Sequence, residues 1–430
     1  MKKVLVLTYY MPPCNGAPSW RPYSWAQNFH LHGWFPVVVT RHWQGDESSW
    51  EDFLRDNHRP IRHERNSQFE QYSLPTKRFR LNDILDSKGL HKRLLANLYY
   101  FVLGLAGRFN SEIDADLTFR KFVMELLDKD KFDAILVTSP PSVIMRLIPD
   151  IRRKTDAVIV ADIRDLWNNM LLRENYAPSF KQKIWDFLYS SYYKRWLKKV
   201  DAITVIVDQF VPVISKLSPA PVHVIYNGYE SYLFESVNRD RKDKFYFSVV
   251  GNVYPEQDLS VMLKGLSVFL ADKSPEEINV RFIGVDALGD IGAGVRKEVP
   301  AEFLTITGRV SKEMAVYETA NATVLSYPGW KGVKGIISTK MFDYIASGNR
   351  ILIAPGDGDI IDAMVSDSGA GKSVDDVDAF VSLLEQWFME WKQTGDLSTG
   401  SENEKIRFYS RENQAKRMAA LLDALSANKN

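Results

Sequence analysis

The chain has 430 residues, of which 45% are apolar and 25% are charged, and its net charge is +1. This length exceeds one ordinary hydrophobic core, so about two domains are expected. The balanced charge, with no arm or domain in basic excess, excludes nucleic acid as the main partner. The single cysteine, Cys14, excludes an intramolecular disulfide and a cysteine-based zinc site, and it predicts a reducing compartment.

The first forty residues predict a strand–loop–helix–strand unit. Residues 3–8 form a continuous apolar run, typical of a central parallel strand, and residues 34–40 form a second one after a helix over residues 22–32. The first run is too short for the apolar core of a signal peptide, so we expect a cytoplasmic protein. The loop has no Gly-x-Gly-x-x-Gly motif. Its Gly16 nevertheless lies at the carboxyl edge of the predicted sheet, where such folds bind ligands.

Two segments combine aromatic and apolar residues with basic ones. Residues 80–109 hold an apolar cluster behind a basic lead, and residues 181–199 form a basic aromatic helix. Two interpretations are open for each: a helix that packs on the sheet with its charged end in solvent, or an amphipathic helix that touches a membrane surface. No segment reaches the roughly 18–20 apolar residues of a membrane span, so peripheral contact is the membrane role considered.

Three charged residues follow a predicted buried strand at residues 157–162. Asp162, Arg164 and Asp165 therefore lie at the carboxyl edge of the sheet, where doubly wound folds build active sites. The two carboxylates are candidates to position or deprotonate an acceptor hydroxyl, with Arg164 holding a carboxylate in place. The alternative is a buried Arg–Asp pair that only holds the loop.

Asn227 and Gly228 form a predicted turn that marks the domain boundary. A second α/β half follows, in which Gly251 comes directly after the first strand. The expected fold class is α/β, with a first domain over residues 1–226 and a second over residues 227–403. The predicted strands of the second half are residues 245–250, 279–284, 303–307 and 322–326.

Residues 326–359 predict an anion-binding unit. A glycine-rich loop with Lys331 and Lys334 leads into a helix over residues 338–347, and Lys340 lies in the first turn of that helix. Backbone amides, the helix dipole and a lysine suit a nucleotide diphosphate sugar. The alternative is an ordinary strand–helix unit with a loose loop.

The Asp-x-Asp sequence at residues 357–359 follows a predicted strand in this segment. We interpret it as a turn whose carboxylates cap the next helix, and we expect no metal ion and no cofactor.

Several motifs in order along the chain resemble the retaining GT-B glycosyltransferases, the family that includes sucrose synthase and bacterial polysaccharide and glycolipid sugar transferases. The resemblance covers most of the chain and is weakest over residues 41–130. The motifs that carry it lie in residues 9–40, 161–167, 224–229 and 340–348.

The resemblance implies two Rossmann-like domains with parallel sheets facing across a cleft, with the last helix, residues 404–430, crossing back to the first domain. Asn227 would lie between the domains. It also implies that Gly16, Gly251, Arg309 and Lys340 contact the donor diphosphate. Gly308 and Val310 would hold the base, and Asp343 would bind the ribose hydroxyls.

The chain departs from the family pattern at charged positions. Gly335 stands where the first glutamate of the family's Glu-x7-Glu pair is usual, and Asp343 replaces the second. Gln257 and Asp258 align with an Arg–Lys pair that neutralises the diphosphate. The positive charge would then come from Lys340, Lys334, Lys331 or Arg309.

The resemblance implies a metal-independent, retaining transfer of a sugar from a nucleotide diphosphate sugar to a hydroxyl, in cell-surface polysaccharide or glycolipid synthesis. The departing phosphate would help to deprotonate the acceptor, and a lipid-linked sugar is the expected acceptor if the basic aromatic helices touch lipid. Two alternatives share this architecture. One is a nucleotide-sugar epimerase, and the other is a non-catalytic subunit that binds the nucleotide sugar.

Overall fold

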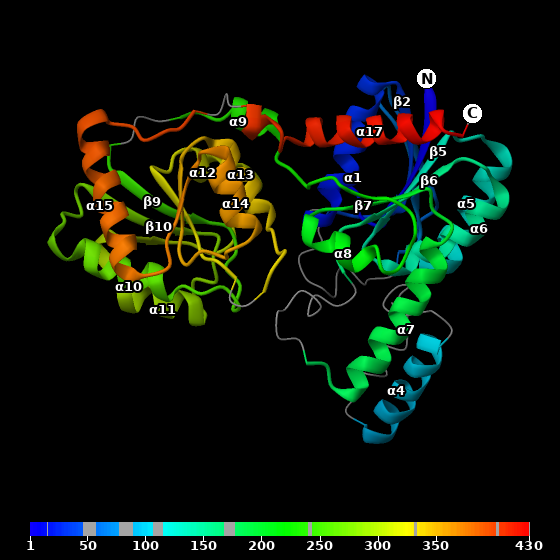
Figure 1. Ribbon diagram of the computed structural model, residues 1–430, viewed down its shortest axis with the longest axis horizontal. Coiled ribbons are helices and arrows are strands. Elements are labelled where there is room, and N and C mark those ends of the chain that lie inside the picture. Colours follow the sequence, from blue (N-terminus) through cyan, green and yellow to red (C-terminus); the bar gives the residue numbers. More distant parts are fainter. Residues whose placement is uncertain are drawn as a thin grey trace. The chain divides into compact units, whose positions relative to one another are not determined.

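The computed structural model describes residues 1–14, 16–45, 57–76, 89–105, 115–166, 177–239, 243–330, 333–400 and 404–429. These residues divide into two units, each built around a twisted sheet with helices on its faces (Figure 1). The first unit holds the described residues up to Tyr226 and from Gln414 onward, and the second holds those from Asn227 to Asn413. The α/β class with two parallel sheets is therefore confirmed.

The described sheet of the first unit has the strand order β3-β4-β2-β1-β5-β6-β7-β8. All neighbours are parallel except β3 and β4, which come from the segment where no strand was predicted. The strands are β1 (Lys2–Leu7), β2 (Trp34–Arg41), β3 (Arg62–Arg65), β4 (Glu70–Leu74), β5 (Ala134–Ser139), β6 (Val158–Ile163), β7 (Ala202–Val205) and β8 (Val222–Val224).

The longer helices of the first unit connect these parallel strands. Helix α4 lies between β4 and β5 in the chain and α7 lies between β6 and β7, and both project away from the sheet (Figure 1). The bounds are α1 (Ala17–Asn28), α4 (Leu90–Leu105), α5 (Ala115–Lys129), α6 (Ile148–Lys154), α7 (Phe180–Leu197) and α8 (Val211–Ile214).

The described sheet of the second unit is parallel throughout, in the order β11-β10-β9-β12-β13-β14. Its core is rich in phenylalanine and aliphatic side chains. The strands are β9 (Phe245–Val250), β10 (Ile278–Ile283), β11 (Leu304–Ile306), β12 (Val324–Tyr327), β13 (Arg350–Ile353) and β14 (Gly371–Ser373). The helices are α9 (Ser231–Glu235), α10 (Ser260–Phe269), α11 (Asp290–Glu298), α12 (Lys312–Ala320), α13 (Thr339–Ser347), α14 (Ile360–Ser368), α15 (Val377–Thr394) and α16 (Glu404–Arg407).

Within the described residues, the chain passes between the units at two places. The first lies between Tyr226 and Asn227, at the predicted seam. The second lies between Asn413 and Gln414, inside α17 (Arg411–Ala427), and not at residue 404. The return is later than expected because the residues before it pack in the second unit. The Tyr409 ring lies 5.9 Å from that of Phe342, and the Tyr409 carbonyl accepts a hydrogen bond from the Tyr229 amide at 3.1 Å.

The last helix completes the core of the first unit. Four of its side chains are buried against residues of the central strands and of α1. The final helix therefore packs with the first half of the chain, as we expected. The four residues are Ala415, Met418, Ala419 and Leu422.

Helix α1 begins earlier than predicted. We expected a helix start at Pro22, because proline suits the first helical position, but the helix starts at Ala17 and contains Pro22 in its interior. Pro22 has no N–H to donate to the carbonyl of Pro18, four residues earlier. The guanidinium of Arg164 donates to that carbonyl instead.

Candidate active site

The strand order of the second sheet reverses between β9 and β12. In open parallel sheets, ligands bind beyond the carboxyl ends of the strands at such a reversal. Gly251 follows β9 directly, and Tyr327 is the last residue of β12. The loops after these two strands are therefore the candidate ligand site of this unit.

The loop after β9 needs its glycine. Gly251 has a φ of 94°, and a Cβ atom there would lie 3.4 Å from Cδ of Lys340. The phenol of Tyr344 holds Val250, the residue before this glycine. It accepts a hydrogen bond from the Val250 amide at 2.7 Å and donates one to the Val250 carbonyl at 2.9 Å. The backbone of this loop is thus pinned by helix α13 at the reversal point.

Lys340, in the first turn of α13, closes the same loop. Its Nζ donates to the carbonyl of Asn252 at 2.7 Å and lies 4.8 Å from the centre of the Tyr327 ring. The side chain is half-buried, and removal of the ammonium from water lowers the pKa of Lys340 to about 7. The structure therefore brings Gly251 and Lys340 together, as the predicted diphosphate site requires.

The turn at residues 308–310, which we predicted to hold the base, lies near this loop. A Cβ at Gly284 would lie 3.6 Å from Cα of Gly251 and 3.9 Å from Cγ2 of Val310. Gly308 and Arg309 are exposed between β11 and α12. The structure thus places Val310 near Gly251, and it leaves the Arg309 side chain in solvent.

Asp343 is engaged by a lysine. Its Oδ2 accepts from Nζ of Lys312 at 2.6 Å, and both side chains are partly shielded from water. A ribose that binds Asp343 would share the carboxylate with this ammonium. The pairing makes Asp343 a hydrogen-bond acceptor with a fixed direction.

The two residues aligned with a basic pair support the loop. Gln257 is buried, and its Nε2 donates to the Pro328 carbonyl at 2.7 Å while its Oε1 accepts from the Tyr254 amide at 3.1 Å. Asp258 accepts from the Ser260 amide at 2.8 Å at the start of α10. Neither residue supplies positive charge, so a diphosphate here would depend on Lys340 more heavily than in the family pattern.

The loop after β13 is held both by the loop that precedes α13 and by its own carboxylates. Nζ of Lys334 donates to the carbonyls of Asp357 and Gly358, each at 3.2 Å, and the Gly335 amide donates to Asp359. The Asp357 carboxylate accepts from the amides of Asp359, Ile361 and Asp362, which is the capping geometry that the sequence predicted. Lys331 lies outside the described residues.

In the first unit, the strand order reverses between β1 and β5, and Gly16 lies there as the N-cap of α1. Asp162 and Arg164 follow nearby on β6 and after it. Gly16 has a φ of −91°, so its extended backbone does not itself require glycine. The place that we predicted for Gly16 is therefore correct, and its diphosphate contact stays a prediction.

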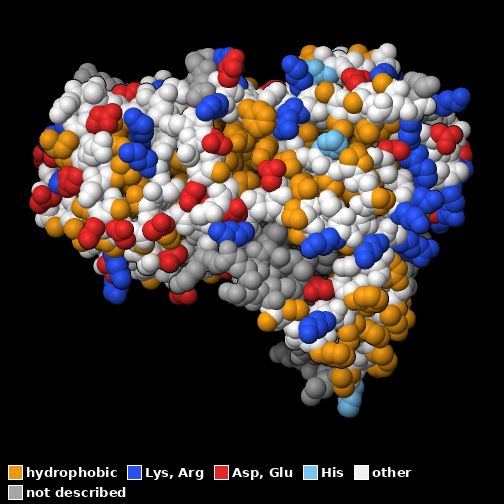
Figure 2. All heavy atoms as spheres, viewed as in Figure 1, with side chains coloured by type: hydrophobic (Ala, Val, Ile, Leu, Met, Phe, Trp, Pro, Cys, Tyr) orange, Lys and Arg blue, Asp and Glu red, His pale blue; other side chains and the backbone are white. Residues whose placement is uncertain are grey.

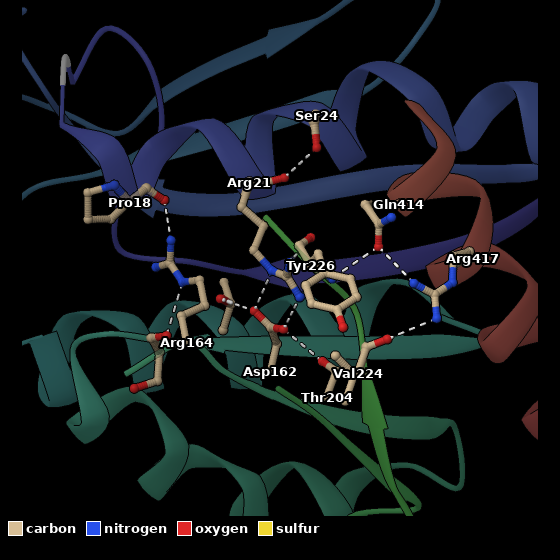
Figure 3. A network of polar contacts seen from close by, with 12 residues as sticks. Pro18, Arg21, Ser24, Asp162, Arg164, Thr204, Val224, Tyr226, Gln414 and Arg417 are labelled. Carbon is tan, nitrogen blue, oxygen red and sulfur yellow. Dashed lines mark hydrogen bonds and ion pairs between the residues drawn. The ribbon is translucent and has the colours of Figure 1, made fainter. Parts of the chain in front are cut away.

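Asp162 is fully buried, and its carboxylate is hydrogen-bonded to other side chains of the protein. The carboxylate has no exposed surface and accepts four hydrogen bonds, two from Arg21 on α1 at 2.7 and 3.2 Å, one from Thr138 at 2.8 Å and one from Thr204 at 2.7 Å (Figure 3). Four donors fill the acceptor capacity of a carboxylate. This does not fit the role of an acceptor base, and it fits the alternative of a buried ion pair that ties α1 to the sheet.

Arg164 satisfies the carbonyl that Pro22 leaves open. Its Nη1 donates to the Pro18 carbonyl, and its Nε donates to the Ser139 carbonyl at 3.0 Å (Figure 3). Burial lowers the pKa of Arg164 from its ordinary value. The side chain therefore holds the N-terminal part of α1 to the end of β5 through two backbone carbonyls, which differs from the predicted role of holding a carboxylate in place.

Asp165 and Asn227 have more open surroundings. Asp165 is exposed one residue beyond Arg164, so it is the one predicted acceptor-side carboxylate that solvent reaches. Asn227 is half-buried as the first residue of the second unit. Gly228 beside it has a φ of 84°, and a Cβ there would lie 2.6 Å from the Tyr409 carbonyl, so the turn requires glycine.

A polar network joins the linker to the last helix. Arg21 donates to the Tyr226 carbonyl at 2.7 Å, Gln414 accepts from the Tyr226 amide at 3.0 Å, and Arg417 donates to the Val224 carbonyl at 3.1 Å (Figure 3). Arg21 thus touches both Asp162 and the linker. The sequence analysis did not single out Arg21, although it is the one charged residue of α1 and a buried arginine needs a polar partner.

The architecture is that of the GT-B fold. Over its full length the chain is similar to sucrose-phosphate synthase from Thermosynechococcus elongatus, with a TM-score of 0.62, 12% identity and 100% of both chains covered. A glycosyltransferase from Rickettsia africae gives a TM-score of 0.62 at 10% identity, covering 100% of this chain and 99% of that one. HepE from Anabaena, in complex with UDP and glucose, gives 0.57 at 10% identity over 99% of this chain and 100% of that one. No protein-family model matches the chain, and no curated protein matches it in sequence.

Proposed function

We propose that the chain transfers a sugar from a nucleotide diphosphate sugar to a hydroxyl group, with retention at the anomeric carbon and without a metal ion. The observation that carries the proposal is the pairing of Gly251 and Lys340 at the reversal of the second sheet. A left-handed glycine allows a diphosphate to approach the backbone. Among the described residues, Lys340 donates to no carboxylate, so its ammonium can take an anion as its partner.

The donor diphosphate would lie against the loop after β9 and the first turn of α13. Three sources of positive potential meet there: the Lys340 ammonium, the backbone amides of the glycine loop and the N-terminal end of the α13 dipole. Charge builds on the phosphate as the bond to the sugar breaks. These groups would stabilise that charge, which is the largest electrostatic demand of the reaction.

The acceptor proton would go to the departing phosphate. The bond between the anomeric carbon and the phosphate oxygen breaks, the bond to the acceptor oxygen forms on the same face, and a phosphate oxygen takes the acceptor proton. This route needs no carboxylate base from the protein. The enclosure of Asp162 by four donors supports it, since that carboxylate has no capacity left for a substrate.

The nucleotide and the acceptor are further parts of the proposal. Two proteins of this fold carry uridine nucleotides, the trehalose-6-phosphate enzyme from E. coli with UDP-2-fluoro glucose and HepE with UDP, so uridine diphosphate is the first donor nucleotide to test. For the acceptor we propose a hydroxyl on a lipid-linked sugar, reached by peripheral contact with the cytoplasmic membrane face during polysaccharide or glycolipid synthesis.

A thermal-shift panel of nucleoside diphosphates tests the donor site. A ligand that binds the folded state raises the melting temperature by mass action, and at 100 times its Kd the gain is about 2.7 kcal/mol. We expect one nucleotide to shift the wild-type protein and to shift Lys340→Met much less. No shift with any nucleotide would overturn the donor site. Transfer to a sugar acceptor in the presence of a chelator then tests the metal-free route.

A non-catalytic nucleotide-binding subunit is the second candidate, because Gln257 and Asp258 add no positive charge to the diphosphate site. Nucleotide binding with neither hydrolysis nor transfer across a panel of donor sugars would favour it. Release of an epimerised sugar from donor alone would instead favour an epimerase.

A further inference from the structure

Helices α4 and α7 expose an unusual amount of apolar surface. The pair lies side by side, with the rings of Phe101 and Trp185 6.2 Å apart, and it projects from the rest of the first unit (Figure 1). Half of the large apolar side chains that are exposed in the described residues lie on these two helices (Figure 2). They are Leu94, Leu95, Leu98, Tyr99, Phe101, Val102 and Leu105 on α4, and Phe180 and Phe187 on α7.

The apolar residues of α4 form one broad face. Leu94, Leu98 and Leu105 follow one another at helical spacing, and Leu94 is 64% and Leu98 61% exposed. Leu95 and Tyr99 widen this stripe on one side. In a helix that packs on its own sheet, such residues would be covered, so the first of our two interpretations for this segment does not fit the exposed stripe.

Positive charge accompanies the apolar face. Helices α4 and α7 contain six Lys or Arg residues and one acidic residue, Asp186. Lys92, Lys181 and Lys183 are exposed at the N-terminal ends of the two helices. Basic residues in the first turn oppose the helix dipole, so they do not serve helix stability there. An external anion would complement both the lysines and the positive end of each dipole.

The combination favours a lipid surface over other partners. Among the described residues, no helix has the length and apolarity to cross a bilayer, so contact would be along the surface. Interfacial helices pair a broad apolar face with Lys and Arg and with aromatic residues at the boundary, as Tyr99, Trp185 and Phe187 do here. A second copy of the chain would bring the same positive charges to this face and, on α4, no acidic residue to meet them.

We propose that α4 and α7 form a docking surface for anionic membranes, in which the apolar face of α4 enters the headgroup region and the lysines contact lipid phosphates. The proposal names the face that would serve a lipid-linked acceptor, and in that respect it rests on the proposed function. Vesicle binding without any donor tests the surface by itself, so its failure and the failure of sugar transfer are distinguishable.

The test uses the full chain and two kinds of vesicle, phosphatidylcholine alone and phosphatidylcholine with phosphatidylglycerol. We expect co-sedimentation with the anionic vesicles at low salt and weaker binding as salt is added. Lys181→Gln with Lys183→Gln should weaken binding about thirtyfold, since each lysine near an anionic surface contributes about 1 kcal/mol. Lys264→Gln, an exposed lysine on α10, is the matched control and should leave binding unchanged.

The apolar contribution is tested by Leu94→Glu with Leu98→Glu. These residues are exposed, so the folded state should persist, which circular dichroism and thermal melting check. Binding should be lost, whereas Leu288→Glu, at a residue that is 98% exposed in the second unit, should bind as the wild type does. Hydrogen exchange on vesicles should slow at the amides of α4.

Three results would overturn the proposal. They are no binding of the wild type to anionic vesicles at low salt, equal loss in the Leu288→Glu control, and a dimer in solution that the α4 variants dissociate while vesicle binding is absent. The last result would assign the surface to a second copy of this chain.

Discussion

Lys340→Met should change the pH dependence of nucleotide binding. The pKa of Lys340 lies at about 7 instead of its usual 10.5, because the ammonium is withdrawn from water. A bound diphosphate favours the charged form and raises this pKa again. Above pH 7, binding therefore takes up a proton, and the affinity of the wild-type protein should fall by up to about tenfold per pH unit. Lys340→Met has no proton to take up, so its weaker affinity should not depend on pH in this window.

The same substitution should raise the stability of the unliganded protein. The folded state binds fewer protons than the unfolded chain between pH 7 and pH 10.5, so the lysine lowers stability at neutral pH and this cost disappears as pH rises to 10.5. At about 1.36 kcal/mol per pH unit the full effect is roughly 4–5 kcal/mol. Solvent reaches part of the side chain, and we expect Lys340→Met to recover about 2 kcal/mol at pH 7.

Isothermal titration in two buffers of different ionisation enthalpy measures the proton uptake, and thermal melting from pH 6 to pH 9 measures the stability. Lys372→Met, at an exposed lysine on the edge strand β14, is the control and should keep the wild-type pH dependence. Wild-type affinity that stays flat from pH 7 to pH 9 would refute the reasoning, as would the same slope in Lys340→Met.

Three substitutions test the neighbouring assignments. Gly251→Ala should cost about 1–2 kcal/mol of stability from its left-handed backbone and should weaken nucleotide binding, whereas Gly395→Ala, with a φ of 74° and open space around it, should cost stability alone. Asp343→Asn should weaken binding of a nucleoside diphosphate and leave pyrophosphate binding unchanged, because only the former has a ribose. Asp162→Asn should destabilise the protein by about 3–5 kcal/mol in urea unfolding, because it removes the counter-ion of a buried arginine.

A specific result would contradict each of these three predictions. Equal effects of the two alanine substitutions on nucleotide binding would remove the loop after β9 from the site. Weakened pyrophosphate binding in Asp343→Asn would place that residue at the phosphates. An Asp162→Asn protein that keeps its stability and loses transfer would restore Asp162 as a catalytic residue.

Local sequence patterns were enough to predict most of the elements. Apolar runs mark the central strands, and the helix that ends at Gly348 stops there because that residue adopts a φ of 68°. The turn at Gly228 and the change of unit at Tyr226 are likewise local features. The pairing of β3 with β4 was missed, because the largely polar sequences of these two short strands, RHER and EQYSL, contain no apolar run to mark them.

Side-chain roles depend on distant partners and were harder to predict. Asp162 meets Arg21, which is 141 residues away in sequence, and Arg164 meets Pro18, 146 residues away. Both were predicted at the carboxyl edge of the sheet, and both are there. What the sequence did not reveal is that the protein itself already occupies their polar atoms. Lys340 lies beside the loop after β9, and its contact with a diphosphate stays a prediction.

The position of the last helix in the chain affects how the first unit can fold during synthesis. Ala415, Met418 and Leu422 fill part of the core of the first unit, but a ribosome makes them after every residue of the second. Domains generally fold as units and in order from the N-terminus during synthesis. Here the core of the earlier unit stays incomplete, with an apolar surface open, until α17 has left the exit tunnel. A nascent chain that stops at residue 403 should therefore recruit chaperones at its N-terminal half, and a clone ending at Tyr226 should be poorly soluble unless the helix is supplied as a separate peptide.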